Sequence, residues 1–191
     1  MNGPPPPAAR AIWQGFHWAF FIDVQGLILC LGRFQEALQL DLVDSASREL
    51  RTAAVLLRAS GAAMQLAGSF SRDAYQDDVR VSMMPPGVQS SSFSGLMSWE
   101  HSRLMRLWHQ LSPQLAQLPE ALQPDHEAFV QAFFSMLSAH REVCEKFGGG
   151  DGGSLRSGRD CAVDILDRFG RSRWETIDPQ QQYGGGCPFA K

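Results

Sequence analysis

The sequence predicts an all-α fold, and three observations support that prediction. Apolar residues recur every three or four positions through most of the 191 residues. No segment shows the strict alternation of apolar and polar residues that marks a half-buried strand. Prolines fall between the periodic segments and separate them. We therefore expect a bundle of about five to six helices.

The composition limits the classes of partner. A chain of 191 residues that is 44% hydrophobic and 19% charged is typical of one globular domain with a sizeable core. Its formal net charge of -3 gives no basic field for nucleic acid or for an anionic membrane. No apolar signal region is present, and no uninterrupted apolar run approaches the roughly 20 residues of a membrane span. The expectation is a cytoplasmic protein.

The chain divides by composition into three parts. Residues 1–10 form a Pro-rich leader that we expect to be disordered. Residues 11–175 form one helical domain, and residues 176–191 form a Gly-rich tail that we expect to be flexible. Within the domain, residues 71–95 read as a long irregular loop, because Pro85-Pro86 excludes helix there. Long loops inside compact domains are more often functional than accidental.

Capping residues and periodicity place five helices in this domain. They are Ala11 to about Leu40, a second helix capped by Asp44 or Ser45 and running to about Phe70, Gly95 to Leu111, a central helix capped by Asp125, and Ser154 to Phe169. A Pro-punctuated link fills residues 112–124. His109 and His126 are expected to be exposed polar positions.

The central helix carries the pair of residues that points to chemistry. His140 and Cys144 are four residues apart, so their side chains lie on one face, one turn from each other. An imidazole is a metal ligand and a thiolate is a nucleophile. The Gly-rich run at 148–153 ends the helix and supplies a loop whose backbone can approach a bound molecule. A planar iron cofactor fits this pattern, with the imidazole on the iron and the sulfur bonded to the ring edge.

Two other classes of function remain open on the same residues. His140, Cys144 and a further histidine would equally suit zinc or a non-haem metal. Alternatively, the chain is a non-catalytic helical module that binds haem as a signal, and Cys187-Pro188 resembles a short haem-regulatory motif.

Several segments, in order, resemble the tryptophan 2,3-dioxygenase superfamily. The run from Gly87 to Ser94 resembles that family's Ser-Gly-Phe-Gln-Ser segment, and His140 to Ser154 resembles its proximal-histidine helix and glycine loop. Arg173-Trp174 follows in the expected order. Cys144 departs from the dioxygenases, which have a valine-like residue there. A His-x(n)-His-x-x-x-Cys pattern is instead similar to the haem-dependent tyrosine (3-methyl-L-tyrosine) hydroxylase branch.

This resemblance implies roles for individual residues. His101, His140 and Cys144 match the three motif positions, which implies a distal acid/base, the iron ligand and a single thioether to haem. His17 is the second candidate for the distal acid/base. Residues implied to contact the substrate are Phe93, Ser94, Ser154 and Arg80.

Ser94 poses a specific problem, because it aligns with the arginine that binds the substrate carboxylate in the dioxygenases. A serine cannot replace the paired donors of a guanidinium. Either Arg80, Arg103 or Arg106 takes over that role, or the substrate is not an ordinary amino acid.

The activity that the resemblance implies is that of a haem-dependent oxygenase or peroxygenase. It would oxygenate, chiefly by hydroxylation, a small aromatic substrate of tyrosine or indole type in secondary metabolism, using dioxygen or hydrogen peroxide. Dioxygenase activity is the weaker alternative, and a homo-oligomer is compatible with the resemblance.

Overall fold

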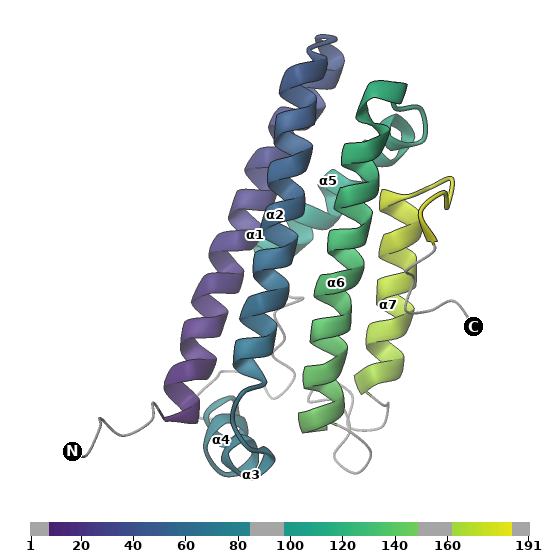
Figure 1. Cartoon of the computed structure of the whole chain (residues 1–191). Coiled ribbons are helices and arrows are strands. Elements are labelled where there is room, and N and C mark those ends of the chain that lie inside the picture. The colour runs from purple at the N-terminus through teal and green to yellow at the C-terminus, as the bar shows by residue number, and fades with distance from the viewer. Residues whose placement is uncertain (1–7, 85–97, 149–161, 185–191) are drawn as a thin grey trace, which may run out of the picture.

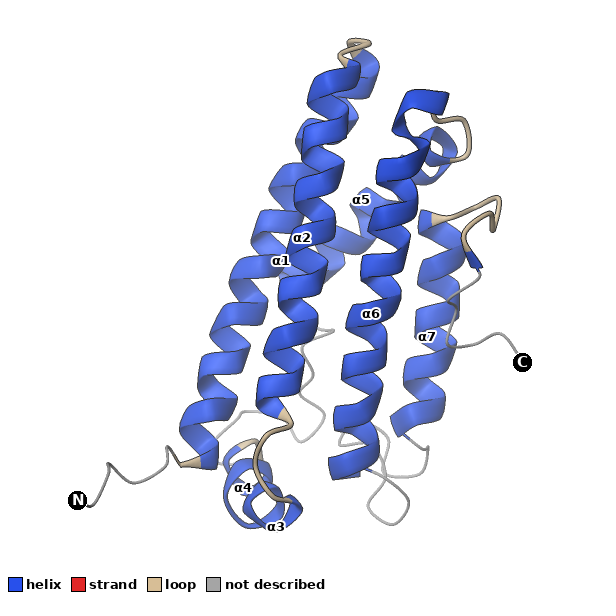
Figure 2. Ribbon diagram, in the orientation of Figure 1, coloured by secondary structure: helices blue, strands red, loops and turns tan. Residues whose placement is uncertain are grey.

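The computed structural model describes residues 8–84, 98–148 and 162–184, and every regular element in these ranges is helical (Figure 2). This confirms the predicted all-α class. The long helices are α1 (Ala9–Gln39), α2 (Val43–Ala67), α5 (Trp99–Leu115), α6 (Gln123–Gly148) and α7 (Ala162–Ile177). The short elements are α3 (Arg72–Ala74), the π-helix η1 (Tyr75–Val79), α4 (Arg80–Ser82) and the 3₁₀-helix η3 (Glu120–Leu122).

The long helices form one elongated bundle (Figure 1). Helix α2 packs against both α1 and α6, α7 packs against α6, and α5 lies behind this row and contacts α1 and α7. We call the end that carries the α1–α2 turn the upper end, as Figure 1 shows it. The segment from α3 to α4 lies at the lower end, beside the first turns of α1.

The α1–α2 turn is set by backbone hydrogen bonds at the end of α1. The Leu42 N–H donates to the Ala37 carbonyl at 2.9 Å, and the Asp41 N–H donates to the Leu38 carbonyl at 3.3 Å. Between these bonds Asp41 has a φ of 55°, in the left-handed region that aspartate tolerates better than most residues. This motif ends α1 and reverses the chain, so α2 returns antiparallel along it.

Helices α2 and α6 approach closely because α2 presents small residues to α6. A Cβ atom placed on Gly61 would lie 3.2 Å from the Met136 Cα, which is closer than a side chain tolerates without a shift. The upper half of the bundle is filled with large apolar side chains. Those that are fully buried include Leu27, Leu31, Phe34, Leu50, Leu57, Leu107, Leu111, Leu122, Phe129 and Phe133.

The predicted loop at 71–95 is wrong for its first part, because residues 72–82 are helical. Ser71 begins the segment by accepting a hydrogen bond from the Ala74 N–H at 3.1 Å. Tyr75 and Val79, one turn apart, are buried with Val143 and Phe147 of α6. Tertiary packing of this pair outweighs the nearby prolines. The remainder of the predicted loop, 85–97, lies outside the described residues.

Three predicted helix boundaries are also wrong. Helix α2 begins at Val43 and has no side-chain cap at Asp44 or Ser45. Helix α5 continues through Pro113, because Leu111 and Leu115 on either side are buried and their packing offsets one lost backbone hydrogen bond. Asp125 lies inside the first turn of α6, where its carboxylate accepts a hydrogen bond from the Ser47 hydroxyl at 2.5 Å.

The chain after the predicted end of the domain is packed against the bundle as far as it is described. Helix α7 runs to Ile177, eight residues beyond the predicted end at Phe169. Asp178 is only 1% exposed and accepts hydrogen bonds from the Trp174 indole N–H and from the N–H groups of Gln182 and Tyr183. We call these four residues the Asp178 cluster. The predicted flexible tail therefore does not begin at residue 176.

His126, predicted to be exposed, is only 3% exposed. Its Nε2–H donates to the Ile177 carbonyl at 2.6 Å, and its ring meets the Tyr183 ring edge-on at 5.2 Å. This bond ties the start of α6 to the end of α7. The sequence prediction failed because the two residues that cover His126, Ile177 and Tyr183, both lie in the predicted tail.

Helix α1 is apolar around most of its circumference. An 18-residue window of it has a mean hydropathy of 1.4, and 28% of that window is buried. By length and composition this helix could cross a membrane. The sequence prediction did not anticipate this, because it considered only uninterrupted apolar runs. Core helices of soluble proteins pass the same test, and α1 packs against α2 and α5.

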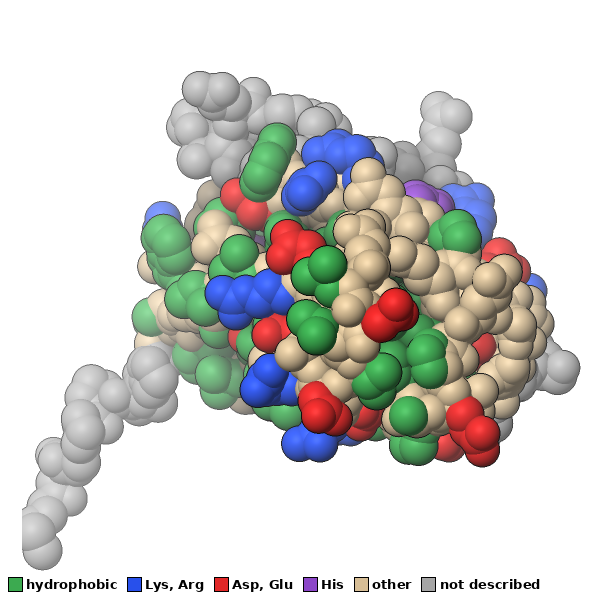
Figure 3. All heavy atoms as spheres, turned by 90° about the horizontal axis from the view of Figure 1, so that it is seen from above, with side chains coloured by type: hydrophobic (Ala, Val, Ile, Leu, Met, Phe, Trp, Pro, Cys, Tyr) green, Lys and Arg blue, Asp and Glu red, His purple; other side chains and the backbone are tan. Residues whose placement is uncertain are grey.

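At the upper end of the bundle, acidic, basic and apolar side chains alternate over the surface (Figure 3).

Candidate functional site

The candidate site begins on the inner face of α6. Phe133, Leu137, His140 and Cys144 follow one another at intervals of four, three and four residues, so they share that face. Phe133 and Leu137 are only 1% and 3% exposed, whereas His140 and Cys144 are partly exposed. The face is therefore closed by packing in the upper half and accessible in the lower half.

His101 lies in the first turn of α5, and its backbone is fixed by a cap. The His101 N–H donates to the Ser98 hydroxyl at 3.1 Å, which satisfies one of the free amides at the helix start. The His101 Nε2 lies 3.0 Å from Nη2 of Arg173 on α7. A guanidinium can only donate, so Nε2 accepts and the neutral ring carries its proton on Nδ1.

Arg173 joins the two histidines electrostatically. Its Nε donates to the Met105 sulfur at 3.2 Å, and its guanidinium lies 5.3 Å from the centre of the Phe169 ring. Burial lowers the pKa of Arg173, and within the described ranges no carboxylate forms an ion pair with it. Within those ranges its positive charge is therefore held by sulfur, imidazole and aromatic contacts.

Both site histidines are neutral at physiological pH. Burial, and next the charge of Arg173, lower the pKa of His101 to about 4. The same two causes, in the same order, lower the pKa of His140 to about 4. Among the residues that the structure describes, no hydrogen bond engages the His140 ring. A neutral imidazole with a free lone pair is the form that ligates iron, and a thiol lies one turn further on. This donor set fits a haem.

A second group of residues lies where the short helices pack against α6, close enough to Cys144 for its charge to act on Tyr75. The Tyr75 ring stacks on Phe147 at 4.5 Å with an interplanar angle of 11°. Burial raises the pKa of Tyr75, and the charge of Arg80 opposes that rise while Cys144 adds to it. Arg80, a predicted substrate contact, therefore lies on α4 within electrostatic reach of the Tyr75 hydroxyl.

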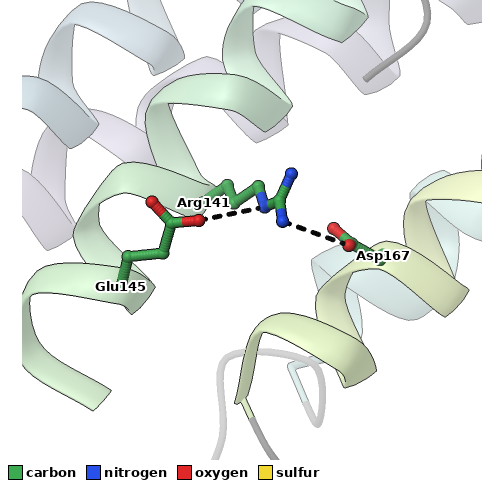
Figure 4. Close-up of polar contacts among 3 residues, drawn as sticks. All are labelled: Arg141, Glu145 and Asp167. Atoms are coloured by element: carbon green, nitrogen blue, oxygen red, sulfur yellow. Dashed lines mark ion pairs between the residues drawn. The ribbon is translucent and has the colours of Figure 1, made fainter. Parts of the chain in front are cut away.

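An ion pair beside His140 links the two helices of the site (Figure 4). Arg141 lies 3.3 Å from Glu145 on α6 and 3.7 Å from Asp167 on α7. These side chains are partly exposed, so each pair contributes only about 0–1 kcal/mol to stability. Only the Arg141–Asp167 pair joins α6 to α7, the helix that carries Arg173.

Of the remaining predicted site residues the structure describes only His17, and none of its contacts in the described part of the chain is with His101, His140, Cys144 or Arg173. His17 is exposed on α1, where its Nδ1–H donates to the Trp13 carbonyl at 2.8 Å and its ring lies 4.9 Å from that of Phe16. Phe16, next to His17, belongs to the same buried cluster as Ala139, the neighbour of His140 on α6, together with Met64 and Ala67 of α2. Phe93, Ser94, Ser154 and the 148–153 glycines after Gly148 lie outside the described residues, as do Cys161 and Cys187.

Arg173 is the site residue that sequence reasoning missed, although a signal for it exists. Leu166, Phe169, Arg173 and Ile177 recur at helical spacing, which places an arginine in the middle of an apolar stripe. A charged residue at such a position is more informative than one on a solvated face. The prediction used Arg173 only as part of a family resemblance.

The zinc alternative gains no support from the geometry. Within residues 8–84, 98–148 and 162–184, no three side chains of His, Cys, Asp or Glu are grouped closely enough to hold a metal ion. A structural zinc site needs four ligands and a catalytic one needs three.

Comparisons with known proteins identify relatives. The family model described as SfmD 3-methyl-L-tyrosine peroxygenase matches residues 1–125. A 3-methyl-L-tyrosine peroxygenase from Streptomyces lavendulae is 25% identical over 186 residues, which cover 92% of this chain and 49% of the relative. The chain thus spans about half the length of the curated relative it matches. No solved structure matches. His140, Cys144 and Arg173 lie beyond the part that the family model covers, and the wider resemblance to tryptophan 2,3-dioxygenases stays a prediction.

Proposed function

Because the chain belongs to the SfmD 3-methyl-L-tyrosine peroxygenase family, we propose that it is a haem-dependent enzyme that oxygenates an aromatic substrate of tyrosine type. The relative's name indicates peroxide as the oxygen donor and a ring-substituted tyrosine as the substrate. Hydroxylation of the ring is the expected outcome. Dioxygen as oxidant and an indole as substrate are the alternatives that an assay must separate.

The arrangement of His140, Cys144 and His101 carries this proposal. His140 and Cys144 occupy the accessible half of the inner face of α6, and His101 approaches the same Arg173 that lowers the pKa of His140. His140 would hold the iron through its neutral imidazole, and Cys144 would anchor the ring edge through one thioether. Haem, when bound, supplies the oxidising chemistry.

The protein's own contribution is to position groups, move a proton and exclude water. The His101 ring has its lone pair on Nε2, so it can accept a proton at that atom from a phenol or a peroxide hydroxyl. That hydroxyl must first replace Arg173 Nη2 as the donor to Nε2. Tyr75, Phe147 and Trp13 form an aromatic wall beyond Cys144 that excludes water from this side.

Covalent attachment gives a test that is independent of activity. The full chain is reconstituted with hemin under reducing conditions, denatured in acid and weighed intact. The wild type and Cys30→Ala should retain the mass of haem, and Cys144→Ala should lose it. Cys30 is the matched control because it is the other cysteine outside a disulfide that the structure describes and lies buried in the core. Extractable haem in the wild type would refute the thioether.

The oxidant and the substrate class are tested on the haem-loaded chain. L-tyrosine, 3-methyl-L-tyrosine and L-tryptophan are each incubated with hydrogen peroxide, or with dioxygen and a reductant. A peroxygenase acting on tyrosines adds one oxygen atom to the first two with peroxide alone. Addition of two oxygen atoms to tryptophan under dioxygen would assign the dioxygenase reaction in its place.

A further inference from the structure

A small cavity lies between α5 and α7 next to the histidine site. Its volume is about 190 Å³, below the range of about 300–1,000 Å³ typical of whole ligands. It can therefore take one functional group of a larger molecule. Its lining comes from Met105, Trp108, His109, Phe169, Ser172, Arg173 and Thr176.

Two side chains of this lining have hydrogen-bond donors to offer. Trp108 is only 3% exposed, and its indole Nε1–H has no acceptor among the described residues. An indole N–H is a donor only, and leaving it buried without a partner costs about 1–3 kcal/mol. Arg173 is likewise a donor only. A group that satisfies both must present acceptor oxygens.

The charge of the lining indicates that those oxygens belong to an anion. Arg173 forms no ion pair with a carboxylate in the described part of the chain, although it is partly buried and contacts Met105, His101 and Phe169. Burying an isolated cation is unfavourable unless a group of opposite charge pairs with it. A guanidinium fork matches the two oxygens of a carboxylate better than any other common anion except phosphate.

We propose that this cavity binds a carboxylate group of the molecule held at the histidine site, with Arg173 and the Trp108 indole N–H as its donors. The proposal rests on the proposed function and would provide the carboxylate contact that Ser94 cannot make. The carboxylate could come from the amino-acid substrate or from a haem propionate. Both offer the same chemistry to Arg173, so the experiment must tell them apart.

Two pairs of probes separate these sources. Hemin is compared with its dimethyl ester, which lacks free propionates, and L-tyrosine is compared with tyramine, which lacks the carboxylate. Dissociation constants are measured on the full chain by absorbance for the porphyrins and by calorimetry for the amines. The variants are Arg173→Met and Trp108→Phe. Arg168→Met is the matched control, because Arg168 is exposed on α7 and lies over the same Phe169 ring at 6.0 Å.

The expected result is a preference of at least about tenfold for the carboxylate-bearing member of one pair, from the strength of charged hydrogen bonds. Arg173→Met should abolish that preference, Trp108→Phe should reduce it about threefold to tenfold, and Arg168→Met should keep it. If Arg173→Met loses the preference for hemin over its dimethyl ester, the site binds a propionate. If it loses the preference for L-tyrosine over tyramine, the site binds the substrate.

Three outcomes would overturn the proposal. They are a wild type without preference in either pair, a preference that survives Arg173→Met, and an equal weakening of both members of a pair, which indicates a structural role. Thermal unfolding of the ligand-free chain is a further readout: Arg173→Met should unfold at the same temperature as the wild type or higher, because an uncompensated buried charge is removed. A wild type that binds no hemin refutes the proposed function, and the tyrosine pair alone then decides the carboxylate site.

Discussion

The upper and lower halves of the inner face of α6 have the same helical spacing and opposite properties. In the upper half Phe133 and Leu137 are buried, and the Trp108 ring meets the Phe133 ring edge-on at 5.7 Å. In the lower half His140 and Cys144 take up the next two positions and remain partly exposed. One continuous stripe thus supplies packing energy at one end and reactive groups at the other.

The two halves also differ in whether their polar side chains have hydrogen-bond or ion-pair partners. The upper half is filled mainly by apolar residues, and the Trp108 indole N–H is a buried donor there without an acceptor among the described residues. The lower half holds a histidine without a hydrogen bond among the described residues, and Arg173 of α7, whose charge acts on that histidine, forms no ion pair with a carboxylate there. Stability and chemistry should therefore respond to substitution in different places, and four predictions test this division.

The largest effect is expected in the upper half. Phe133→Ala removes a ring that is 1% exposed and leaves a cavity, so it should lower the free energy of unfolding by about 3–5 kcal/mol. Urea denaturation of the ligand-free chain measures this value. A loss below about 1 kcal/mol would mean that the upper half is not the stabilising core.

The Asp178 cluster should give the next largest effect. Asp178→Ala leaves the Trp174 indole N–H and two backbone N–H groups without their acceptor, which should cost about 2–4 kcal/mol. Glu175→Ala, an exposed substitution on the same helix, should change stability by less than about 0.5 kcal/mol. Equal values for the two variants in urea denaturation would contradict the anchoring role.

A smaller, pH-dependent effect is expected from His126. Burial lowers the pKa of His126 below its ordinary value of 6.5, although the Ile177 hydrogen bond and Asp178 oppose that shift. Below pH 6.5 the unfolded chain binds a proton that the folded chain does not, so stability falls as the pH drops. The slope from this residue is at most about 1.4 kcal/mol per pH unit.

This slope can be assigned by comparison with His126→Gln. The free energy of unfolding is measured for both proteins between pH 7.5 and 5, where most carboxylates stay ionised. His101 and His140 add to the slope with the same sign in both proteins. The difference between the two curves isolates His126, and parallel curves would show that His126 does not titrate differently in the folded state.

The smallest effect on stability is expected in the lower half. His140→Ala should change the free energy of unfolding by less than about 1 kcal/mol, because the residue is not fully buried and its ring makes no hydrogen bond within the described ranges. It should nevertheless weaken hemin binding more than about a hundredfold, since loss of supporting partners alone costs 10–100-fold at metal sites. An unchanged Soret spectrum in this variant would exclude His140 as the ligand.

The helical class and the pairing of His140 with Cys144 on one helix could be predicted from periodicity alone. Both follow from local spacing, which one sequence contains in full. The helical segment at 72–82 could not, because Tyr75 and Val79 are buried by residues some 70 positions later in α6. Its local sequence, which runs into Pro85-Pro86, favours a loop.

Arg173 and His126 show the same limit within the site. The contact of Arg173 with His101 spans 72 residues, and the bond from His126 to Ile177 spans 51. No local pattern contains such a contact. The one local signal for Arg173 is its position in an apolar stripe. The predicted helix ends at Phe169, eight residues before the end of α7, so it does not include Arg173.

The Asp178 cluster also determines how this chain can be shortened or tagged. Helix α7 ends at Ile177 by its backbone, yet Asp178, Gln182 and Tyr183 complete the bonds that hold its last turn, one turn beyond Arg173. An expression clone trimmed to the last helical residue would lose those bonds and loosen the arginine with them. A C-terminal fusion should therefore begin after Tyr183.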